Sequence, residues 1–377
     1  MRDYLNKNGA IRFAFPIDGD CLNKNDGKST EEGILVTVWV EAPENHAVEI
    51  CGKSASFQDG KYSADILIAD RETVLTAEDK TACTQCQITV FQLQNPLGGY
   101  RLSSDDNILF LCDINDHKDT YKSIFENPYL AVYKKAHDLY GAKVHLNLFY
   151  EFDSENPSFV PGSHKYFNLS MMTDKFREEF RANAHWLKLS FHAKAEHPAE
   201  PYKFARGETV REHAKLVNRE ILRFAGPEVL SACTTIHWGE ANEDVVSALR
   251  EMGYKALAGY FMPKGAPVAY YAPKELIEYV YERDFWKDTQ MDMFFGRIDA
   301  VINRGTLEEN LADLKEITAS ATRGGFVSIM IHEQYFYPTY GGYLPDFADR
   351  ILECCKLLAQ KGYEGRHLQE VFGFNHL

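Results

Sequence analysis

The sequence lacks several features that would place a chain in a large class of proteins at once. It has no run of about 18 or more apolar residues, which argues against a membrane-spanning helix. Lys and Arg number 41 against 55 Asp and Glu, a formal net charge of −14. Nucleic acid and anionic membranes are therefore disfavoured as partners, because both are bound through clustered positive charge. The start, MRDYLNKNGA, lacks the apolar segment of a signal peptide. We expect a cytoplasmic protein, or a secreted one whose leader precedes this sequence.

Cysteine gives little guidance, because the eight cysteines are spread thinly along the chain. Cys83 and Cys86 form a single Cys-x-x-Cys, which without a second pair is weak evidence for zinc. We interpret this pair as structural or incidental. What the chain has in quantity is hydrophobic residues, 45% of the total, and aromatic residues, 13%. A chain of this length and composition can build two domains with a large core.

Residues 1–95 predict a small all-β domain. Short β-rich runs alternate with turn clusters such as Asp18-Gly19-Asp20, and no long helical period occurs. The run LVTVWV (35–40) alternates as a half-buried sandwich strand does. The segment Pro43–Ile68 resembles the immunoglobulin-like modules that accompany bacterial carbohydrate enzymes. We expect a β-sandwich over residues 1–95, followed by a linker at Gln94–Ser104, whose Asn-Pro and Gly-Gly pairs are typical of turns.

From residue 105 onward, strands and helices are expected to alternate. Asn127 caps a helix with Pro128 in its first turn, and Thr306 with Glu309 forms a capping box. Repeated strand–helix units predict an α/β fold with a parallel sheet, most simply a complete or incomplete (β/α) barrel over residues 96–377. The expected strands are Ile108–Cys112, Lys143–Tyr150, Trp186–His192, Cys233–His237, Lys255–Phe261 and Phe326–His332, with further strands around Val268–Tyr271 and Phe294–Val301.

Several of these apolar runs end on a side chain that can bind a metal or move a proton. The runs are NILFLCD ending at Asp113, WLKLSFH ending at His192 with His197 in the next loop, ACTTIH ending at His237, and FVSIMIHE ending at His332 and Glu333. The carboxyl ends of barrel strands face one mouth, so we expect these residues at one site. An Asp with two His leaves a position for water on a hydrolytic zinc ion. The sequence thus predicts a divalent metal, with zinc favoured.

Residues 105–377 resemble the polysaccharide deacetylase superfamily of glycoside hydrolase/deacetylase (β/α) barrels. FLCDIND (110–116) stands where that family has an acidic motif, SFHAKAEH (190–197) where it has paired histidines, and IMIHE (329–333) where it has a late Leu-x-His motif. The family's Asp-Asp pair is replaced by Cys112-Asp113. The resemblance therefore implies that the metal-binding aspartate is present and the aspartate that acts as base is absent.

The resemblance implies a metal-dependent hydrolase that removes acetyl groups from carbohydrate. Asp113, His192 and either His197 or His237 would bind the metal, and His332 would be the general acid, with Glu333 close by. Asp116 or Glu151 would replace the missing base. The loop QYFYPTYGGYLPDF (334–347) crowds aromatic rings at the expected mouth, and aromatic faces suit sugar rings. The candidate substrate-binding residues are Trp238, Tyr335, Tyr337 and Tyr340.

Two other functions fit the same residues. A glycosidase on the same barrel would use Glu333 with Asp113 or Glu151, about 5–10 Å apart across a cleft. A non-catalytic protein would bind glycan through the aromatic loop, and Cys112 in place of an aspartate favours that alternative. Each of these functions makes carbohydrate the expected ligand. The sequence leaves the sugar, the acyl group and the oligomeric state open.

Overall fold

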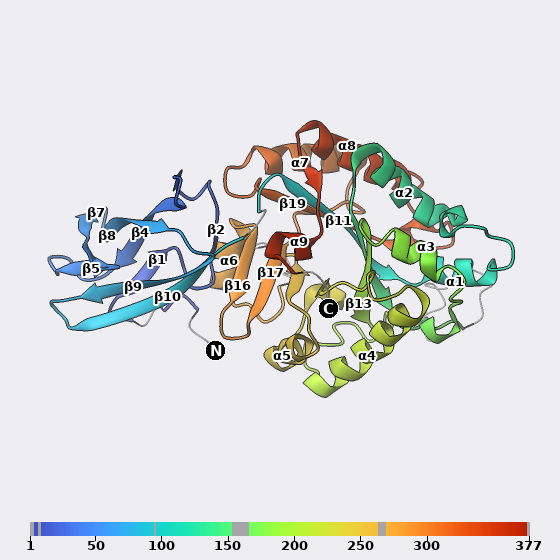
Figure 1. The fold of residues 1–377 in the computed structure, drawn as a ribbon, viewed down its shortest axis with the longest axis horizontal. Coiled ribbons are helices and arrows are strands. Elements are labelled where there is room, and N and C mark those ends of the chain that lie inside the picture. The colour runs from blue at the N-terminus through green and yellow to red at the C-terminus, as the bar shows by residue number, and fades with distance from the viewer. Residues whose placement is uncertain (1–3, 7–8, 94–95, 153–165, 263–268, 375–377) are drawn as a thin grey trace.

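Figure 1 shows the computed structural model, which describes residues 4–6, 9–93, 96–152, 166–262 and 269–374. The N-terminal part, in blue, contains two small sheets. The first contains β1 (Arg12–Phe15), β4 (Ile34–Glu41), β8 (Lys61–Ile68) and β7 (Ser56–Gln58) in that order, with β3 (Lys28–Ser29) paired to β4. The second contains β2 (Cys21–Leu22), β10 (Thr84–Gln92), β9 (Glu72–Asp79), β5 (Val48–Ile50) and β6 (Lys53–Ser54) in that order.

These two sheets share one core, so the β-sandwich expected from the sequence is present. Along β4, buried and more exposed side chains alternate, which is the period-two pattern of a strand with one face in a core. The buried Val36, Val38 and Val40 of this strand belong to the same cluster as Leu75 and Val90 of the second sheet. These strand pairings do not confirm the immunoglobulin-like resemblance, and the domain boundary at residue 95 stays a prediction.

The remainder of the chain is a mixed α/β structure with two further sheets. The larger sheet contains β13 (Leu187–Ala193), β12 (Val144–Phe149), β11 (Gly99–Asn107), β19 (Phe326–His332) and β18 (Ala300–Val301) in that order, with β20 (Glu364–Gly365) also paired to β11. The smaller sheet contains β14 (Cys233–Thr234), β15 (Ala256–Gly259), β17 (Met293–Arg297) and β16 (Phe285–Asp288). Every pairing in the larger sheet is parallel, as alternating strands and helices predict.

The helices follow from clear start and stop signals. Asn127 accepts a hydrogen bond from the Leu130 N–H at the start of α2, and Gly141 ends that helix with a φ of 64°. Thr306 and Glu309 form the predicted capping box of α7. No described helix has the length and apolar character that a membrane crossing needs. The helices are α1 (Leu109–Asp116), α2 (Pro128–Tyr140), α3 (Arg177–Ala182), α4 (Gly207–Phe224), α5 (Glu243–Glu251), α6 (Lys274–Tyr281), α7 (Leu307–Ala319), α8 (Phe347–Gln360) and α9 (Leu368–Phe372).

The expected barrel is not confirmed, because no sheet among the described residues closes on itself. Backbone contacts link the two sheets at both sides. Leu189 of β13 forms an isolated parallel bridge with Leu230, just before β14. On the other side, the Ile298 N–H donates to the Gly259 carbonyl and the Asp299 N–H donates to the Ser328 carbonyl, so the chain passes from one sheet to the other between β17 and β18.

The sequence prediction is wrong at the first strand of this α/β region. The residues expected to form a strand at Ile108–Cys112 begin helix α1, and the expected linker at Gln94–Ser104 contains the first six residues of β11, the strand between β12 and β19. A short apolar run does not distinguish a buried helix from a buried strand. The true strand escaped recognition because its buried positions include the polar residues Arg101, Ser103 and Asp105. The strand expected around Val268–Tyr271 is also not present over its described residues.

The sandwich packs directly against the smaller α/β sheet, as Figure 1 shows beside β16 and α6. Phe91 of β10 and Phe294 of β17 belong to one buried cluster, with ring centroids 5.8 Å apart. Beside this apolar contact, the guanidinium group of Arg283 bonds to Asp20 and Asp26 of the sandwich. The Tyr279 hydroxyl donates to the other oxygen of Asp20 at 2.6 Å. Apolar surface and buried charge thus both fix the sandwich on the α/β region.

Candidate metal centre

The site begins at an irregularity in β11. The register between β11 and β12 shifts between Ser104 and Asn107, and Asp106 has a φ of 62°. Neighbouring side chains on a regular strand point to opposite faces, and a bulge redirects them. Asp105 and Asp106 therefore line the same pocket. The Asn107 side chain stabilises this turn, because its amide donates to the Ser104 carbonyl at 2.7 Å and to the Asn147 carbonyl at 3.1 Å.

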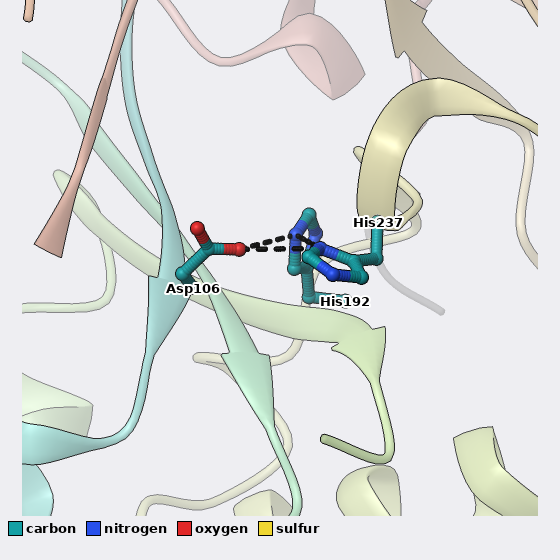
Figure 2. Close-up of side chains that lie close together, drawn as sticks. All are labelled: Asp106, His192 and His237. Atoms are coloured by element: carbon teal, nitrogen blue, oxygen red, sulfur yellow. Dashed lines mark hydrogen bonds and ion pairs between the residues drawn. The ribbon is translucent and has the colours of Figure 1, made fainter. Parts of the chain in front are cut away.

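Three ligand atoms of the kind that bind metals converge at this turn. Asp106 Oδ1 lies 3.0 Å from His192 Nε2 and 3.3 Å from His237 Nδ1, and the two histidine nitrogens are 3.1 Å apart (Figure 2). Ligand atoms about 2.0–2.2 Å from a common ion, at angles between octahedral and tetrahedral, lie roughly 2.8–3.6 Å from one another. The three separations fit that range. All three residues are buried, and no other such group is found among the described residues.

Backbone carbonyl groups fix the orientation of both imidazole rings. His192 Nδ1 lies 2.5 Å from the Thr235 carbonyl oxygen, and His237 Nε2 lies 3.0 Å from the Glu196 carbonyl oxygen. A carbonyl oxygen only accepts, so each of these nitrogens carries the proton in the neutral ring. The lone pairs of His192 Nε2 and His237 Nδ1 then face Asp106 Oδ1. Acceptors so close together require a proton or a cation between them, and this second-sphere arrangement is the one that orients metal-binding histidines.

The electrostatics of the trio favour a negative Asp106. Without a cation, the proton that these acceptors require makes the rings donors. Burial alone would raise the pKa of Asp106, but hydrogen bonds from His192 and His237 then hold it well below its usual value. Burial would likewise lower the pKa of His192, and the carboxylates of Asp105 and Asp106 raise it instead. Beside the trio, burial and the charge of Asp106 raise the pKa of Glu196 to about 7.

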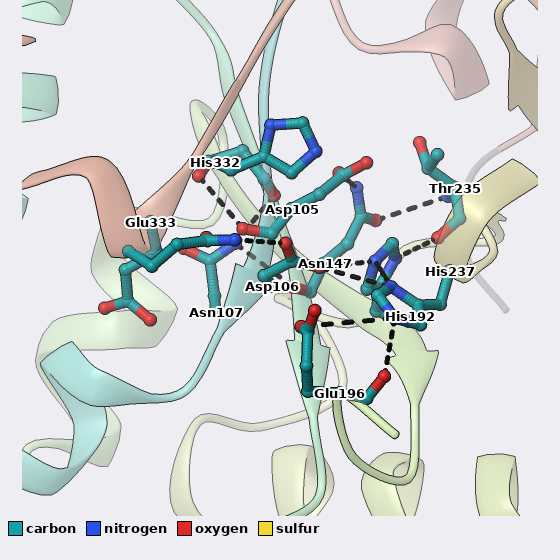
Figure 3. A network of polar contacts seen from close by, with 12 residues as sticks. Asp105, Asp106, Asn107, Asn147, His192, Glu196, Thr235, His237, His332 and Glu333 are labelled. Atoms are coloured by element: carbon teal, nitrogen blue, oxygen red, sulfur yellow. Dashed lines mark hydrogen bonds and ion pairs between the residues drawn. The ribbon is translucent and has the colours of Figure 1, made fainter. Parts of the chain in front are cut away.

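The trio lies in the wall of a pocket of about 460 Å³. Asp105 lines the same pocket, is 2% exposed, and accepts a hydrogen bond from the Asn147 amide at 2.5 Å (Figure 3). His332, the last residue of β19, also lines it, with Nδ1 2.8 Å from the Asn303 amide oxygen. Since the amide oxygen accepts, the Nδ1 atom of a neutral His332 carries the proton and Nε2 is left for a ligand.

The structure brings some of the predicted metal ligands together and separates others. His192 and His237 belong to the trio, and His197 lies outside it on an exposed loop. Asp113 is on α1, where its carboxylate accepts from the Tyr121 hydroxyl at 3.0 Å and from the Asn127 amide at 2.7 Å. The aspartate beside the histidines is Asp106, since β11 ends there and the run leading to Asp113 is helical.

Two of the candidate catalytic carboxylates lie outside the pocket. Asp116 is at the end of α1, and Glu151 pairs with Lys194 at 3.1 Å and accepts from the Tyr166 hydroxyl at 2.6 Å. Two carboxylates lie next to the trio, Asp105 and Glu196. Asp105 directly precedes the trio aspartate in the sequence, and it stands where the sequence prediction treated an aspartate as absent.

The side chain of Glu333 caps the N-terminus of helix α1. Its carboxylate is fully buried and accepts from the backbone N–H groups of Ile108, Leu109 and Phe110 at 2.6–2.8 Å. It thereby satisfies the first N–H groups of α1, which have no acceptor within the helix. Tyr337, a candidate substrate-binding residue, donates its hydroxyl to Glu333 at 3.1 Å and does not line the pocket.

The other aromatic candidates do line the pocket. Trp238 is 49% exposed and has a φ of 64°, a conformation that is rare and strained for a bulky residue. Tyr335 and Tyr340, from the loop after β19, pack edge to face with centroids 5.1 Å apart. Aromatic faces from two different loops thus border the pocket that contains the trio.

Several residues of the site escaped the sequence prediction: Asp105, Asp106, Glu196 and Gln334, which line the pocket, and Asn147, which donates to Asp105. A signal for the first two was present, because Asp105-Asp106 is an adjacent acidic pair of the kind that the family resemblance requires. The Asn-Pro and Gly-Gly pairs just before it favoured a linker, so strand β11 was not predicted there. Asn147 and Gln334 gave no signal, because single amides carry no motif.

Comparisons with known proteins find only distant likenesses. No family model and no curated protein matches the sequence. Among solved structures, a proposed polysaccharide deacetylase from Mycobacterium smegmatis is similar, with a TM-score of 0.44, 10% identity, and coverage of 74% of this chain and 90% of that chain. A proposed polysaccharide deacetylase involved in O-antigen biosynthesis from Bordetella bronchiseptica has a TM-score of 0.34 at 10% identity, covering 70% of this chain and 91% of that chain.

Proposed function

We propose that this protein is a metal-dependent hydrolase that removes acyl groups, most simply acetyl, from carbohydrate. The observation that carries the proposal is the convergence of Asp106 Oδ1, His192 Nε2 and His237 Nδ1, with both imidazole tautomers set by backbone carbonyls. This donor set suits zinc, with room for water or substrate as a further ligand. A bound divalent ion would polarise the acyl carbonyl and lower the pKa of a water molecule.

The residues around the trio supply the proton transfers that such a hydrolysis needs. Asp105 takes a proton from the attacking water, and Asn147 orients it by bonding to one carboxylate oxygen. His332, oriented by Asn303, acts as the imidazolium, protonated on both ring nitrogens, and gives its Nε2 proton to the leaving nitrogen or oxygen. The water oxygen bonds to the acyl carbon and the bond from that carbon to the sugar substituent breaks. The products are a carboxylic acid and a free amine or alcohol on the sugar.

Carbohydrate is the proposed substrate because aromatic side chains border the pocket. Trp238 on one loop, and Tyr335 with Tyr340 on another, offer aromatic faces for the C–H surfaces of sugar rings. The pocket also contains hydrogen-bonding side chains suited to hydroxyl groups. The glycosidase alternative is less well supported, because Glu333, which it would need, is occupied by the N-terminus of α1.

The test is metal content of the purified protein by mass spectrometry, combined with activity on acetylated sugars. We expect about one zinc or similar ion per chain, lost in His237→Ala and retained in His332→Ala, with activity lost in both variants. His332 is the matched control, because it lines the same pocket outside the trio. A wild-type protein that binds no divalent metal after reconstitution would rule out the proposal.

A further inference from the structure

Two buried acceptors of pocket-lining residues, Glu196 Oε2 and Gln334 Oε1, have no hydrogen-bond partner, and Gln334 is the neutral one of the two. Gln334 lies in the short 3-10 helix Glu333–Phe336 that follows β19, is 6% exposed, and lines the pocket. Its Nε2 donates to Asp106 Oδ2 at 2.8 Å, whereas its Oε1 is shielded from solvent and accepts from no group. A buried acceptor in this state costs about 1–3 kcal/mol unless something supplies a donor.

The orientation of this amide is fixed by its neighbour. A carboxylate accepts hydrogen bonds and does not donate them, so the nitrogen of Gln334 must face Asp106. Exchanging the two amide atoms would place Oε1 against the carboxylate oxygen and leave both without a donor. Gln334 Oε1 therefore stays an acceptor, held by the residue that supplies the carboxylate ligand of the trio.

We propose that Gln334 selects the atom that carries the acyl group, by accepting a hydrogen bond from the N–H of a substrate amide after a small shift of its side chain that opens Oε1 to the pocket. This inference rests on the proposed function and narrows its substrate class to N-acyl groups. An amide nitrogen carries the donor that Oε1 lacks. The corresponding oxygen of an ester has no hydrogen and would turn lone pairs toward Oε1. The same contact therefore favours the amide and disfavours the ester, as when buried polar groups reject an analogue that leaves them unpaired.

The experiment compares two ligands that differ only at this atom. They are a tetramer of β-1,4-linked N-acetylglucosamine and the matching glucose tetramer with an O-acetyl group at each C2. Binding of each is measured by calorimetry on metal-free protein, where no turnover occurs, and kcat/KM is measured on metal-loaded protein. The variants are Gln334→Met, which removes the acceptor at similar volume, and Gln369→Met as matched control. Gln369 is also buried, lies on α9 and does not line the pocket.

We expect metal-free wild-type protein to bind the N-acetyl ligand about tenfold or more tightly than the O-acetyl ligand, which is the worth of roughly one hydrogen bond. Gln334→Met should reduce that preference about tenfold in both binding and kcat/KM, and Gln369→Met should keep it. The ratio of the two ligands within one variant cancels any effect of Gln334 on metal binding or folding.

Equal affinities for the two ligands in the wild type, or an unchanged preference in Gln334→Met, would overturn the inference. Selective binding that is lost in Gln334→Met, without turnover of either ligand by metal-loaded protein, would support the Gln334 contact and count against the hydrolase. Turnover of both ligands without selectivity would support the hydrolase and refute the role of Gln334.

Discussion

Replacing Arg283 by Met tests whether the sandwich is a separable module or contributes to the stability of the whole chain. The Arg283 guanidinium donates to Asp20 at 2.9 Å and also bonds to Asp26, and the side chains of these three residues are 10%, 0% and 7% exposed. Burial would lower the pKa of Arg283, but the two carboxylates hold it well above its usual value. Methionine removes this charge and leaves two buried carboxylates side by side.

The magnitude follows from this burial. Removing one partner of a buried ion pair costs about 3–5 kcal/mol, because the other charge stays desolvated. The matched control is Arg12→Met, since Arg12 pairs with Glu41 within the sandwich and both side chains are 29–34% exposed. Exposed pairs contribute about 0–1 kcal/mol. We expect urea unfolding, followed by tryptophan fluorescence, to show a large loss of stability for Arg283→Met and a small one for Arg12→Met.

The loss should also depend on pH. Burial raises the pKa of Asp20 and Arg283 opposes that rise, so Arg283→Met raises the pKa further. A carboxyl group with a raised pKa contributes stability that is present below its unfolded pKa and lost as the pH rises through its folded pKa. The loss of unfolding free energy in Arg283→Met, relative to the wild type, should therefore be larger near pH 8 than near pH 5. A deficit under about 1 kcal/mol, without pH dependence, would refute the argument from buried charge.

Further predictions concern the pocket and the core. Asp105→Asn should lower kcat/KM by about 100-fold or more and leave the metal content unchanged, as measured by mass spectrometry. Glu333→Ala should lower the free energy of unfolding by about 2–4 kcal/mol in urea, because the N–H groups at the start of α1 lose their acceptor; unchanged stability with lost activity would instead make it catalytic. Burial raises the pKa of Asp284 to about 7, so wild-type stability should fall between about pH 4 and pH 7. Asp284→Asn should reduce that fall by about 2–4 kcal/mol, and equal pH dependence of the two proteins would contradict this.

Much of the local structure could be predicted from sequence signals. Caps and stop residues place α2 and α7 closely, since Asn127, Gly141 and Thr306 act through their immediate neighbours. Strand β19 has the expected bounds, because Phe326–His332 is a short, almost fully buried run of the kind found in parallel sheets. Such features depend on backbone preferences and burial patterns that a few adjacent residues already define.

Two of the three residues of the trio could be predicted from the sequence. His192 and His237 each follow an apolar run, so their types and positions pointed to a site. Asp106 did not, because its strand carries polar residues on a buried face and follows turn-like dipeptides. The apolar run at Leu109–Cys112 matched the expected strand better, yet it forms α1, whose start is held by Glu333 more than 220 residues further along the chain. No local window contains that contact.

By itself, the sequence indicated β-rich residues followed by alternating strands and helices, the caps of the helices, and the histidines that follow apolar runs. The tertiary structure alone decided which aspartate lies beside those histidines. An irregularity in β11 directs the side chains of Asp105 and Asp106 toward the same pocket. It also fixed both imidazole tautomers through carbonyls of Thr235 and Glu196, and the amide of Gln334 through Asp106. Short-range preferences depend on neighbours in sequence, whereas these directional contacts exist only once distant strands have paired.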